Sequence, residues 1–235
     1  MKLDKRRTYM QRYVKVRQAY RRVGKLSSRY DGMMTNSSLL GHWALRVFWG
    51  FSEANYQRYI RQAFDGIPAG FDGRLLEVPV GTGALSLPVF RDLPRADITC
   101  LDFSEEMLQK ARERALAMDL SRLKFLAGDV GNLPFADESF DLVLSINGFH
   151  AFPDKPAAFR ETHRVLRKDG IFTGCVYIRG QNAVTDLFVR TFCSQQGYFT
   201  PPFDSLSSLQ EKLRLLYRQV TVSQIGSFAC FTCRK

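Results

Sequence analysis

The sequence predicts an open α/β fold: a seven-stranded, mostly parallel sheet with a C-terminal antiparallel hairpin and helices on both faces. Two observations predict it. Short apolar runs alternate with helical segments from residue 75 to residue 177, as in parallel sheets whose two faces are covered. Near the C-terminus, the strand-like runs Gln219–Ser223 and Ser227–Thr232 are separated by only three residues, which indicates a hairpin. A chain of 235 residues is long enough to bury one sizeable core.

Composition narrows the class of protein. The hydrophobic and charged fractions, 45% and 24%, are those of ordinary globular proteins. No apolar run is long enough to span a bilayer and no apolar signal region begins the chain, so we expect a cytoplasmic protein. Five cysteines without framework spacing predict reduced thiols. Cys230 and Cys233 would point to opposite faces of a strand, so we expect structural thiols and no metal site.

The first thirty residues carry almost all of the net charge. Eleven lysines and arginines stand there against Asp4 alone, and eleven minus one gives +10 of the chain's +11. An apolar stripe at helical spacing runs through the same segment: Tyr9, Tyr13, Val16, Tyr20 and Val23. We favour a solvated helix that docks this stripe on its own domain. The open alternatives are a surface for RNA, anionic lipid or an acidic partner, and an organellar transit segment.

Residues 31–73 are predicted to form a helical lid. Helical periodicity extends from Leu39 to Phe64 with a break near Gly50, and a glycine- and proline-containing turn follows as far as Gly73. Aromatic side chains are frequent here: Trp43, Phe48, Trp49, Phe51, Tyr56, Tyr59 and Phe64. We expect most of them in the core and some of them above a ligand cleft.

The alternating part of the chain follows. The expected strands are Leu75–Val80, Ile98–Leu101, Leu123–Ala127, Phe140–Ile146 and Ile171–Tyr177. The expected helices are Ala84–Arg91, Lys155–Leu166, Asn182–Cys193 and Ser205–Tyr217. A further helix, capped by Ser104, is expected to extend to about Ala117.

The turn after the first strand is the strongest local signal. Glu77 lies near the strand end and is followed by Gly81 and Gly83, which let the backbone turn tightly and approach a ligand closely. A carboxylate at this place repels a pyrophosphate and suits a cationic ligand, such as one with an ammonium or sulfonium group.

Two further carboxylates follow the next two strands. In an open parallel sheet the ligand lies at the carboxyl ends of the strands, near the switch in strand order. Asp102 ends the second strand and can accept both hydroxyls of a ribose, while the adjacent Phe103 can stack on an adenine. Asp129 follows the third strand and can accept from an exocyclic amine. Three acidic residues at successive strand ends make a joint signal that none of them makes alone.

Four segments resemble the class I S-adenosylmethionine-dependent methyltransferases, in the branch of small-molecule and quinone-biosynthesis enzymes. They are Glu77–Gly83, Leu101–Leu108, Gly128–Asp141 and Arg164–Gly170, and the resemblance covers residues 74–235, the C-terminal hairpin included. It implies a Rossmann-like sheet, with S-adenosyl-L-methionine as the cofactor and S-adenosyl-L-homocysteine as its product.

The resemblance also implies roles for the residues of the first loop. Glu77, Gly81 and Gly83 would hold the methionine part of the cofactor. Pro79 stands where the family usually has glycine, which removes one amide donor and stiffens the loop. We expect the cofactor to bind in a slightly altered loop. The property that Pro79 would change is the affinity for the cofactor.

Further along the chain, the resemblance assigns the nucleoside end of the cofactor. Asp102 would bind the ribose hydroxyls, and Phe103 and Met107 would line the adenine. Asp129 and Val130 would bind the edge of the adenine ring.

The acceptor side follows the fourth strand. The resemblance implies that Asn147 and Gly148 face the sulfonium and the substrate. Methyl transfer is an in-line displacement that needs positioning and exclusion of water, and a general base helps some acceptors. His150 is a candidate base, with packing of the loop as the alternative. Tyr30, beside Asp31, resembles part of a lid pair in quinone-type relatives and is a candidate lid residue.

The predicted function is methyl transfer to a small, apolar or aromatic acceptor, an inference from the aromatic lid and the Phe199–Phe203 loop. An RNA-directed methyltransferase recruited by residues 1–30 and a non-catalytic cofactor-binding module stay open as alternatives. No Asn/Asp-Pro-Pro-Tyr/Phe-type base pocket follows the fourth strand, which lowers the odds of the first. A dehydrogenase is disfavoured because Ser86 stands where its fingerprint needs a third glycine or alanine. We divide the chain into a basic arm (1–30), a helical lid (31–73) and a cofactor-binding domain (74–235).

Overall fold

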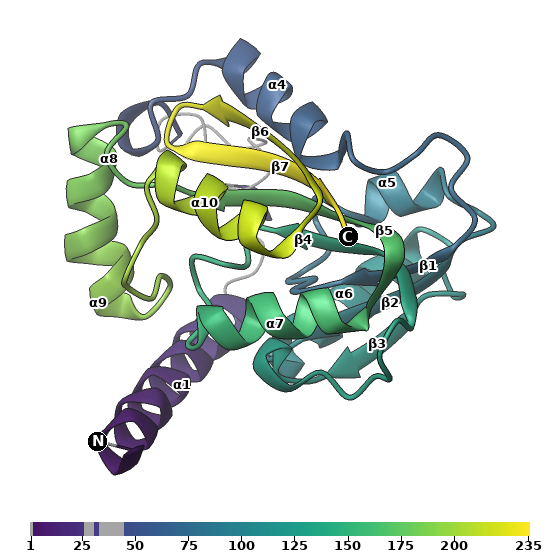
Figure 1. The fold of residues 1–235 in the computed structure, drawn as a ribbon, viewed down its shortest axis with the longest axis horizontal. Helices are drawn as coiled ribbons and strands as arrows, with labels where there is room; N and C mark the ends of the chain where they lie inside the picture. The colour runs from purple at the N-terminus through teal and green to yellow at the C-terminus, as the bar shows by residue number, and fades with distance from the viewer. Residues whose placement is uncertain (1, 26–30, 33–44) are drawn as a thin grey trace.

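A seven-stranded sheet in the order β3-β2-β1-β4-β5-β7-β6 forms the centre of the molecule (Figure 1). The computed structural model describes residues 2–25, 31–32 and 45–235, with the side chains of residues 10–22, 31–32 and 45–235. The strands are β1 (Arg74–Glu77), β2 (Asp97–Asp102), β3 (Lys124–Ala127), β4 (Phe140–Ile146), β5 (Leu166–Tyr177), β6 (Gln219–Ile225) and β7 (Phe228–Arg234). The first five pair in parallel, and β7 pairs antiparallel with β5 and β6. The predicted fold class is confirmed.

The order of the strands reverses at β1. The chain moves outward from β1 to β2 and β3, then returns to place β4 on the other side of β1. The carboxyl ends of β1 and β4 therefore form the topological switch point, where open α/β sheets bind their ligands.

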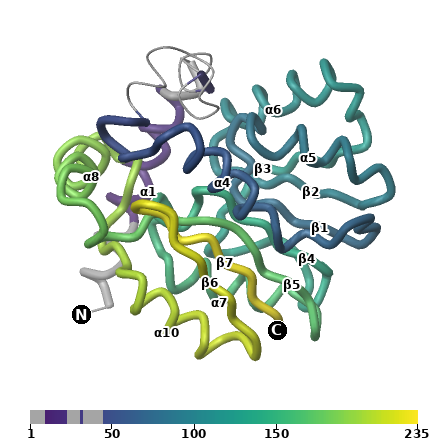
Figure 2. The backbone as a smooth tube through the Cα atoms, turned by 90° about the horizontal axis from the view of Figure 1, so that it is seen from above, coloured from purple at the N-terminus to yellow at the C-terminus, as the bar shows by residue number. Residues whose placement is uncertain are grey.

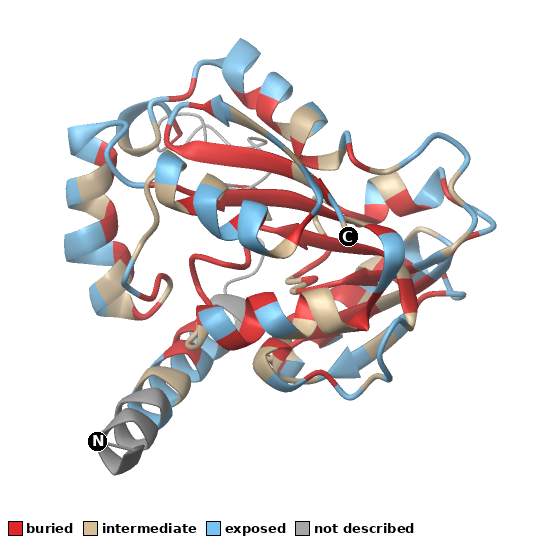
Figure 3. Ribbon diagram, in the orientation of Figure 1, coloured by how far each residue is buried: buried red, intermediate tan, exposed pale blue. Residues whose placement is uncertain are grey.

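Helices cover both faces of the sheet (Figure 2). They are α1 (Lys2–Lys25), α4 (Glu53–Phe64), α5 (Leu87–Arg91), α6 (Glu105–Ala117), α7 (Lys155–Val165), α8 (Ala183–Phe188), α9 (Ser194–Gln196) and α10 (Leu206–Leu216). There are also two short irregular helices, η1 (Val130–Asn132) and η2 (Val189–Cys193), and residues 31–32 and 45–48 are helical as well. One core lies between the sheet and α4, α5 and α6, and a second lies between the sheet and α7 and α10. Figure 3 shows buried residues concentrated along the strands.

Alternation along the strands fills both cores. Leu75 packs in the core on the α4 side and Leu76 in the core on the α7 side, as expected for a strand covered on both faces. Cys230 and Cys233 on β7 lie in opposite cores in the same way. Both thiols are free and buried.

The ends of several elements differ from the prediction. β1 ends at Glu77 rather than Val80, because Pro79 has no N–H to donate to a neighbouring strand. Gly81 and Gly83 have positive φ values of 59° and 69°, so the turn extends further and α5 begins only at Leu87. The helix expected over residues 182–193 consists of α8 and the π-helical η2, and α9 continues it to Gln196.

The lid segment is helical on both sides of the expected break, over residues 45–48 and in α4. Ser52 caps α4 by accepting from the Asn55 amide at 3.2 Å, and Gly50 has a φ of 65°, so the expected break is present. Residues 33–44, with the predicted start of the helix and Trp43, lie outside the described residues.

Candidate functional site

Two neighbouring cavities lie at the carboxyl ends of the strands and share Tyr20 and Pro79 as walls. The first, about 60 Å³, lies beside the loop after β1, and the second, about 50 Å³, lies beside the end of β2. Nine of the eleven predicted cofactor residues line them: Glu77, Pro79, Gly81, Asp102, Phe103, Met107, Asp129, Val130 and Asn147. The predicted residues at four strand ends therefore lie together at one place.

Glu77 forms the acidic floor of the first cavity. It is 1% exposed and accepts a hydrogen bond from the Ser86 hydroxyl at 2.9 Å. Burial raises the pKa of its carboxyl to about 8; the Ser86 hydrogen bond opposes this rise and the nearby Asp102 adds to it. No cation of the described residues forms an ion pair with Glu77. A cationic ligand group would stabilise its ionised form.

Asp102 joins the ends of β1 and β2. One carboxylate oxygen accepts from the Gly81 amide at 2.8 Å, and the other accepts from the Ser104 amide at 2.9 Å. Burial raises the pKa of this carboxyl to about 6, against the lowering effect of the backbone hydrogen bonds. Each oxygen keeps a lone pair free for a further donor, as the binding of two vicinal hydroxyls requires.

The second cavity has an aromatic and apolar lining. Phe103 lines this cavity and is half-buried, and the adjacent Ser104 caps α6 as predicted. Met107, on the first turn of α6, is buried and lines the first cavity. Asp129 caps η1 by accepting from the Gly131 amide at 2.8 Å, and Val130 is buried behind it. These side chains would border a flat aromatic ligand, with Asp129 at its edge.

Asn147 lies where β4 leaves the sheet. Its φ of 55° is rare for a residue other than glycine. Its side-chain oxygen accepts from the Tyr59 hydroxyl at 2.9 Å, and the same hydroxyl lies 3.0 Å from the Cys175 sulfur. The lid helix α4 is thereby tied to the cleft.

Two predicted glycines, Gly83 and Gly148, do not line the cavities but permit close approaches behind them. A Cβ on Gly148 would lie 2.3 Å from Cδ of Pro79, and one on Gly83 would lie 2.4 Å from Cδ1 of Leu87. Gly148 thus makes room for the proline that replaces the usual glycine.

Helix α1 covers the cleft. Its Tyr13 and Tyr20 line the cavities together with Val16. The Tyr13 ring packs edge-on against Phe103 with centroids 4.3 Å apart, and the Tyr20 hydroxyl donates to the Tyr198 carbonyl at 3.2 Å. Docking of the tyrosine stripe on the chain's own domain is confirmed for these residues. The sequence did not indicate that the covered surface would be the candidate site.

Asp31 fixes a second segment over the same loop. Its carboxylate accepts from the Thr82 hydroxyl at 2.5 Å and from Arg114 at 2.6 Å, and Arg114 also donates to the Thr82 carbonyl. Thr82 stands between the two loop glycines, so Asp31 holds the lid segment against them. Tyr30, the predicted lid residue, lies outside the described residues.

His150 is buried in the loop after β4. It is 4% exposed, stacks on Phe199 at 3.8 Å, and accepts at Nδ1 from the Tyr177 amide at 3.3 Å. Burial and, second, the charge of Lys155 lower its pKa to about 3. A ring with this pKa is a weak proton acceptor at neutral pH. The geometry favours the packing alternative over the base.

The fold and the site together define a class of protein. The sheet order, the glycine loop beside a buried carboxyl and the acidic residues at successive strand ends are features of nucleoside-binding methyltransferases. Residues 75–170 match the family model described as a methyltransferase domain. Residues 75–170 are therefore similar to a methyltransferase domain, and S-adenosylmethionine-dependent methyltransferases are among the solved structures with this fold.

Curated relatives agree with this class. The chain is 34% identical over 146 residues to a demethylmenaquinone methyltransferase of Listeria monocytogenes, an alignment that covers 60% of this chain and 62% of the relative. It is 39% identical over 104 residues to a malonyl-[acyl-carrier protein] O-methyltransferase of Geobacter sulfurreducens, over 44% of this chain and 38% of the relative. The chain thus spans less than two thirds of the length of either relative.

The fold extends over nearly the whole chain in one solved structure. This is an S-adenosylmethionine-dependent methyltransferase of Thermotoga maritima, described as a possible histamine N-methyltransferase. The two share a TM-score of 0.65 with 20% identity, over 92% of this chain and 99% of the other. At this identity the likeness concerns the fold alone.

The residues of the cleft fit the cofactor of the family. The buried carboxyl of Glu77, which has no cationic partner among the described ion pairs, suits an ammonium group. Asp102 faces the second cavity with free lone pairs for the ribose hydroxyls, and Phe103 and Met107 border the space for an adenine.

Proposed function

We propose that this chain transfers a methyl group from S-adenosyl-L-methionine to a small, apolar or aromatic acceptor. One contact carries the proposal: the Tyr59 hydroxyl on α4 donates to Asn147 at the cofactor cleft. Behind Tyr59 lies an aromatic cluster, with Phe51 and Phe228 at centroid distances of 5.4 and 5.2 Å. The lid is therefore packed with buried aromatic side chains next to Asn147, and we propose that the acceptor lies against this part of the lid.

A cavity of about 440 Å³ borders this cluster at Phe51. It is lined by Leu45, Arg46, Gly50, Phe51, Ser52, Glu53 and Tyr56. Its volume is in the range of small-molecule sites, and its mixture of apolar side chains with a few polar groups is typical of them. We propose this cavity as part of the acceptor site.

The chain's own residues would position and isolate the reactants. When bound, the cofactor supplies an electrophilic methyl group on a sulfonium. Glu77 and Asp102 hold its charged and hydroxylated parts, while Tyr13, Val16 and Tyr20 exclude water from above. An acceptor positioned in line with this methyl group would receive it, with S-adenosyl-L-homocysteine as the leaving group and the acceptor's proton passing to solvent or to a nearby base. We propose His150 as a positioning residue that orders the loop after β4.

The names of the relatives suggest two kinds of acceptor. The Listeria relative is named for a demethylmenaquinone, and the Geobacter relative for a malonyl group on a carrier protein. The aromatic lid favours the first kind, so we propose an aromatic, quinone-type acceptor for this chain.

Transfer of a labelled methyl group tests the proposal. The panel contains reduced naphthoquinones, simple phenols, malonyl-carrier protein and single-stranded RNA. We expect turnover with the reduced naphthoquinones. The variant Leu45→Phe narrows the cavity, so it should raise the acceptor KM without changing the cofactor Kd. Val47→Phe, two residues away and exposed, is the matched control. Turnover with RNA alone would support the RNA-directed alternative, and cofactor binding without any turnover would support a non-catalytic module.

Two broader predictions belong to the same proposal. Every helix in the described part of the chain is too short or too polar to cross a bilayer. We propose a cytoplasmic location. We also propose the division into a basic arm (1–30), a lid (31–73) and a cofactor-binding domain (74–235).

A further inference from the structure

We propose that the outer face of α1, together with α8 and η2, docks on an anionic lipid bilayer. We call this surface the docking face. It uses the side of α1 that the cofactor cleft does not use. Its binding can be measured without turnover, so it stands apart from the proposed activity.

The outer face of α1 combines cations with exposed apolar groups. Val16 and Ala19 are buried against the domain, whereas Met10 and Val14, one helical turn apart, are 57% and 47% exposed. Arg17 and Arg21 follow at positions 7 and 11 from Met10 and share its side of the helix, with Arg21 ion-paired to Glu106 at 3.0 Å. An interfacial helix presents this combination to a bilayer: apolar side chains beside basic ones.

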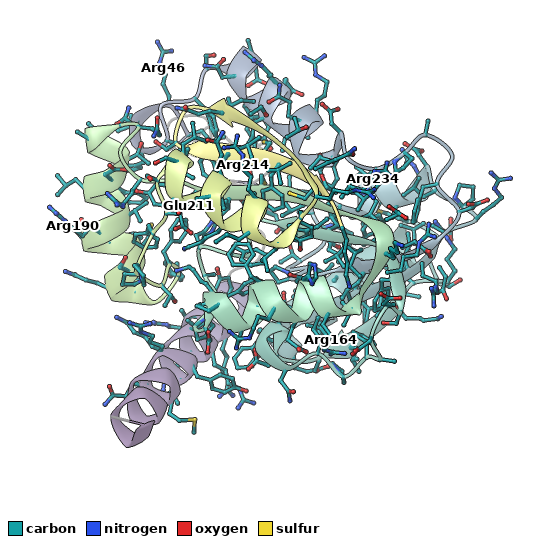
Figure 4. All side chains as sticks on the ribbon, in the orientation of Figure 1. Arg46, Arg164, Arg190, Glu211, Arg214 and Arg234 are labelled. Atoms are coloured by element: carbon teal, nitrogen blue, oxygen red, sulfur yellow. The ribbon has the colours of Figure 1, made fainter. Side chains whose placement is uncertain are left out.

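A second apolar patch lies next to this helix. On α8 and η2, Val184, Leu187 and Phe192 are 56%, 53% and 48% exposed. Arg190 lies among them and points away from the body of the protein (Figure 4). Exposed apolar groups gathered beside a cation mark an interaction surface more strongly than scattered ones do.

Direct contacts hold the two parts of the docking face together. Arg22 of α1 donates to the Gln196 carbonyl at 3.3 Å, and Gly197 packs against Lys15. Figures 1 and 2 both show α1 beside the α8–α9 segment. Between them a groove of about 370 Å³ is lined by Arg12 and Lys15 on one side and by residues 194–201 on the other. A lipid phosphate would find two cations there.

Charge and apolarity together select the partner. Residues 1–29 hold +10 of the chain's net charge of +11, which attracts any polyanion. Exposed Met10, Val14, Val184 and Leu187 gain nothing from a nucleic-acid backbone but are withdrawn from water at a bilayer surface. We therefore choose the bilayer over RNA. Docking there would bring the cleft beneath α1 to the surface that dissolves apolar acceptors.

Vesicle flotation of the full chain tests the proposal. The vesicles consist of phosphatidylcholine alone or with about one third phosphatidylglycerol, at low and high salt. We expect binding to the anionic vesicles that salt weakens. Lys15→Gln with Arg17→Gln should lower the partition coefficient roughly ten- to thirty-fold. The control pair, Arg91→Gln with Lys168→Gln, removes the same charge from exposed positions at the opposite end of the sheet and should leave binding unchanged.

A second pair separates a bilayer from other polyanions. Val184→Ser with Leu187→Ser leaves the charge intact and should still weaken binding to anionic vesicles several-fold. Circular dichroism of each variant shows that it is folded. Absence of binding to anionic vesicles would overturn the proposal. It would also be overturned if single-stranded RNA displaced the vesicles while the serine pair bound them as the wild type does.

Discussion

The Gly81 amide donates to the Asp102 carboxylate at 2.8 Å and thereby joins the loop after β1 to the end of β2. The two residues are 21 positions apart in sequence, and the resemblance assigns them to different parts of the cofactor. Their hydrogen bond links the methionine end of the cleft to the ribose end. A change in either residue should affect both ends.

Replacement of Glu77 by glutamine removes the ionisable group of this side chain and keeps its size and shape. The amide oxygen can still accept from Ser86, and the variant removes the buried carboxyl whose pKa rises to about 8. We expect the free protein to be at least as stable, and S-adenosylhomocysteine to bind roughly tenfold more weakly because its ammonium group loses a counter-charge. Thermal denaturation and calorimetric titration measure the two effects. An unchanged affinity would show that Glu77 does not face the ammonium group.

The same variant gives a pH dependence. The Glu77 pKa rises from an ordinary 4.5 to about 8 on folding, so between these pH values the unfolded chain has already released a proton that the folded chain keeps. The free energy of unfolding therefore falls as pH rises through this window and levels off above pH 8. Glu77→Gln should flatten this fall. Denaturant unfolding at a series of pH values measures it, and equal slopes would contradict the raised pKa.

The covering helix should control how fast the cofactor leaves. The cavities of about 60 and 50 Å³ beneath Tyr20 and Tyr13 are small beside the roughly 300–1,000 Å³ of ligand sites, so α1 must shift for the cofactor to enter. Tyr13→Ala removes the edge contact with Phe103 and should speed cofactor dissociation roughly three- to tenfold. Stopped-flow displacement measures the rate. Met10→Ala, on the outer face of the same helix, is the control and should dissociate at the wild-type rate.

Pro79 and Gly148 should be energetically coupled. A Cβ on Gly148 would overlap Pro79, Phe152 and Ser145, so Gly148→Ala should cost about 1–3 kcal/mol of stability. Pro79→Gly removes the nearest of these contacts and should recover part of the loss. A double-mutant cycle by denaturant unfolding measures the coupling. Strictly additive effects would mean that the two residues do not constrain each other.

The role of His150 can be separated from that of a base. As a positioning residue, His150→Gln should lower the melting temperature, since the Tyr177 amide loses an acceptor, and leave the shape of the pH–rate profile unchanged. If turnover instead fell by roughly two orders of magnitude or more while stability stayed unchanged, the assignment of His150 as the base would be restored.

Sequence alone predicted the sheet and most of the cleft because their signals are local. Apolar runs mark the strands, and in a parallel sheet the residues after them meet at one edge whatever the loops do. Glu77, Asp102 and Asp129 could therefore be placed at one edge from the sequence, and the family resemblance added Asn147.

The remaining features depend on contacts between distant segments. The stripe of Tyr13, Val16 and Tyr20 shows that one face of α1 is buried, but nothing in its spacing indicates the surface that it covers. Asp31 meets Thr82 and Arg114 only after the chain has folded. His150 follows β4 at a typical position for a base, and only the packing of Phe199 shows that the ring is enclosed.

Titration of S-adenosylhomocysteine into the wild type, Asp102→Ala and Asp97→Ala tests the central claim most directly. Asp97 lies on the same strand as Asp102, at its far end, and is the control. We expect micromolar binding to the wild type and to Asp97→Ala, and a loss of about 100-fold in Asp102→Ala, as expected when charge-assisted hydrogen bonds disappear. No binding to a folded wild type, or equal binding to Asp102→Ala, would contradict the assignment of this cleft to the cofactor.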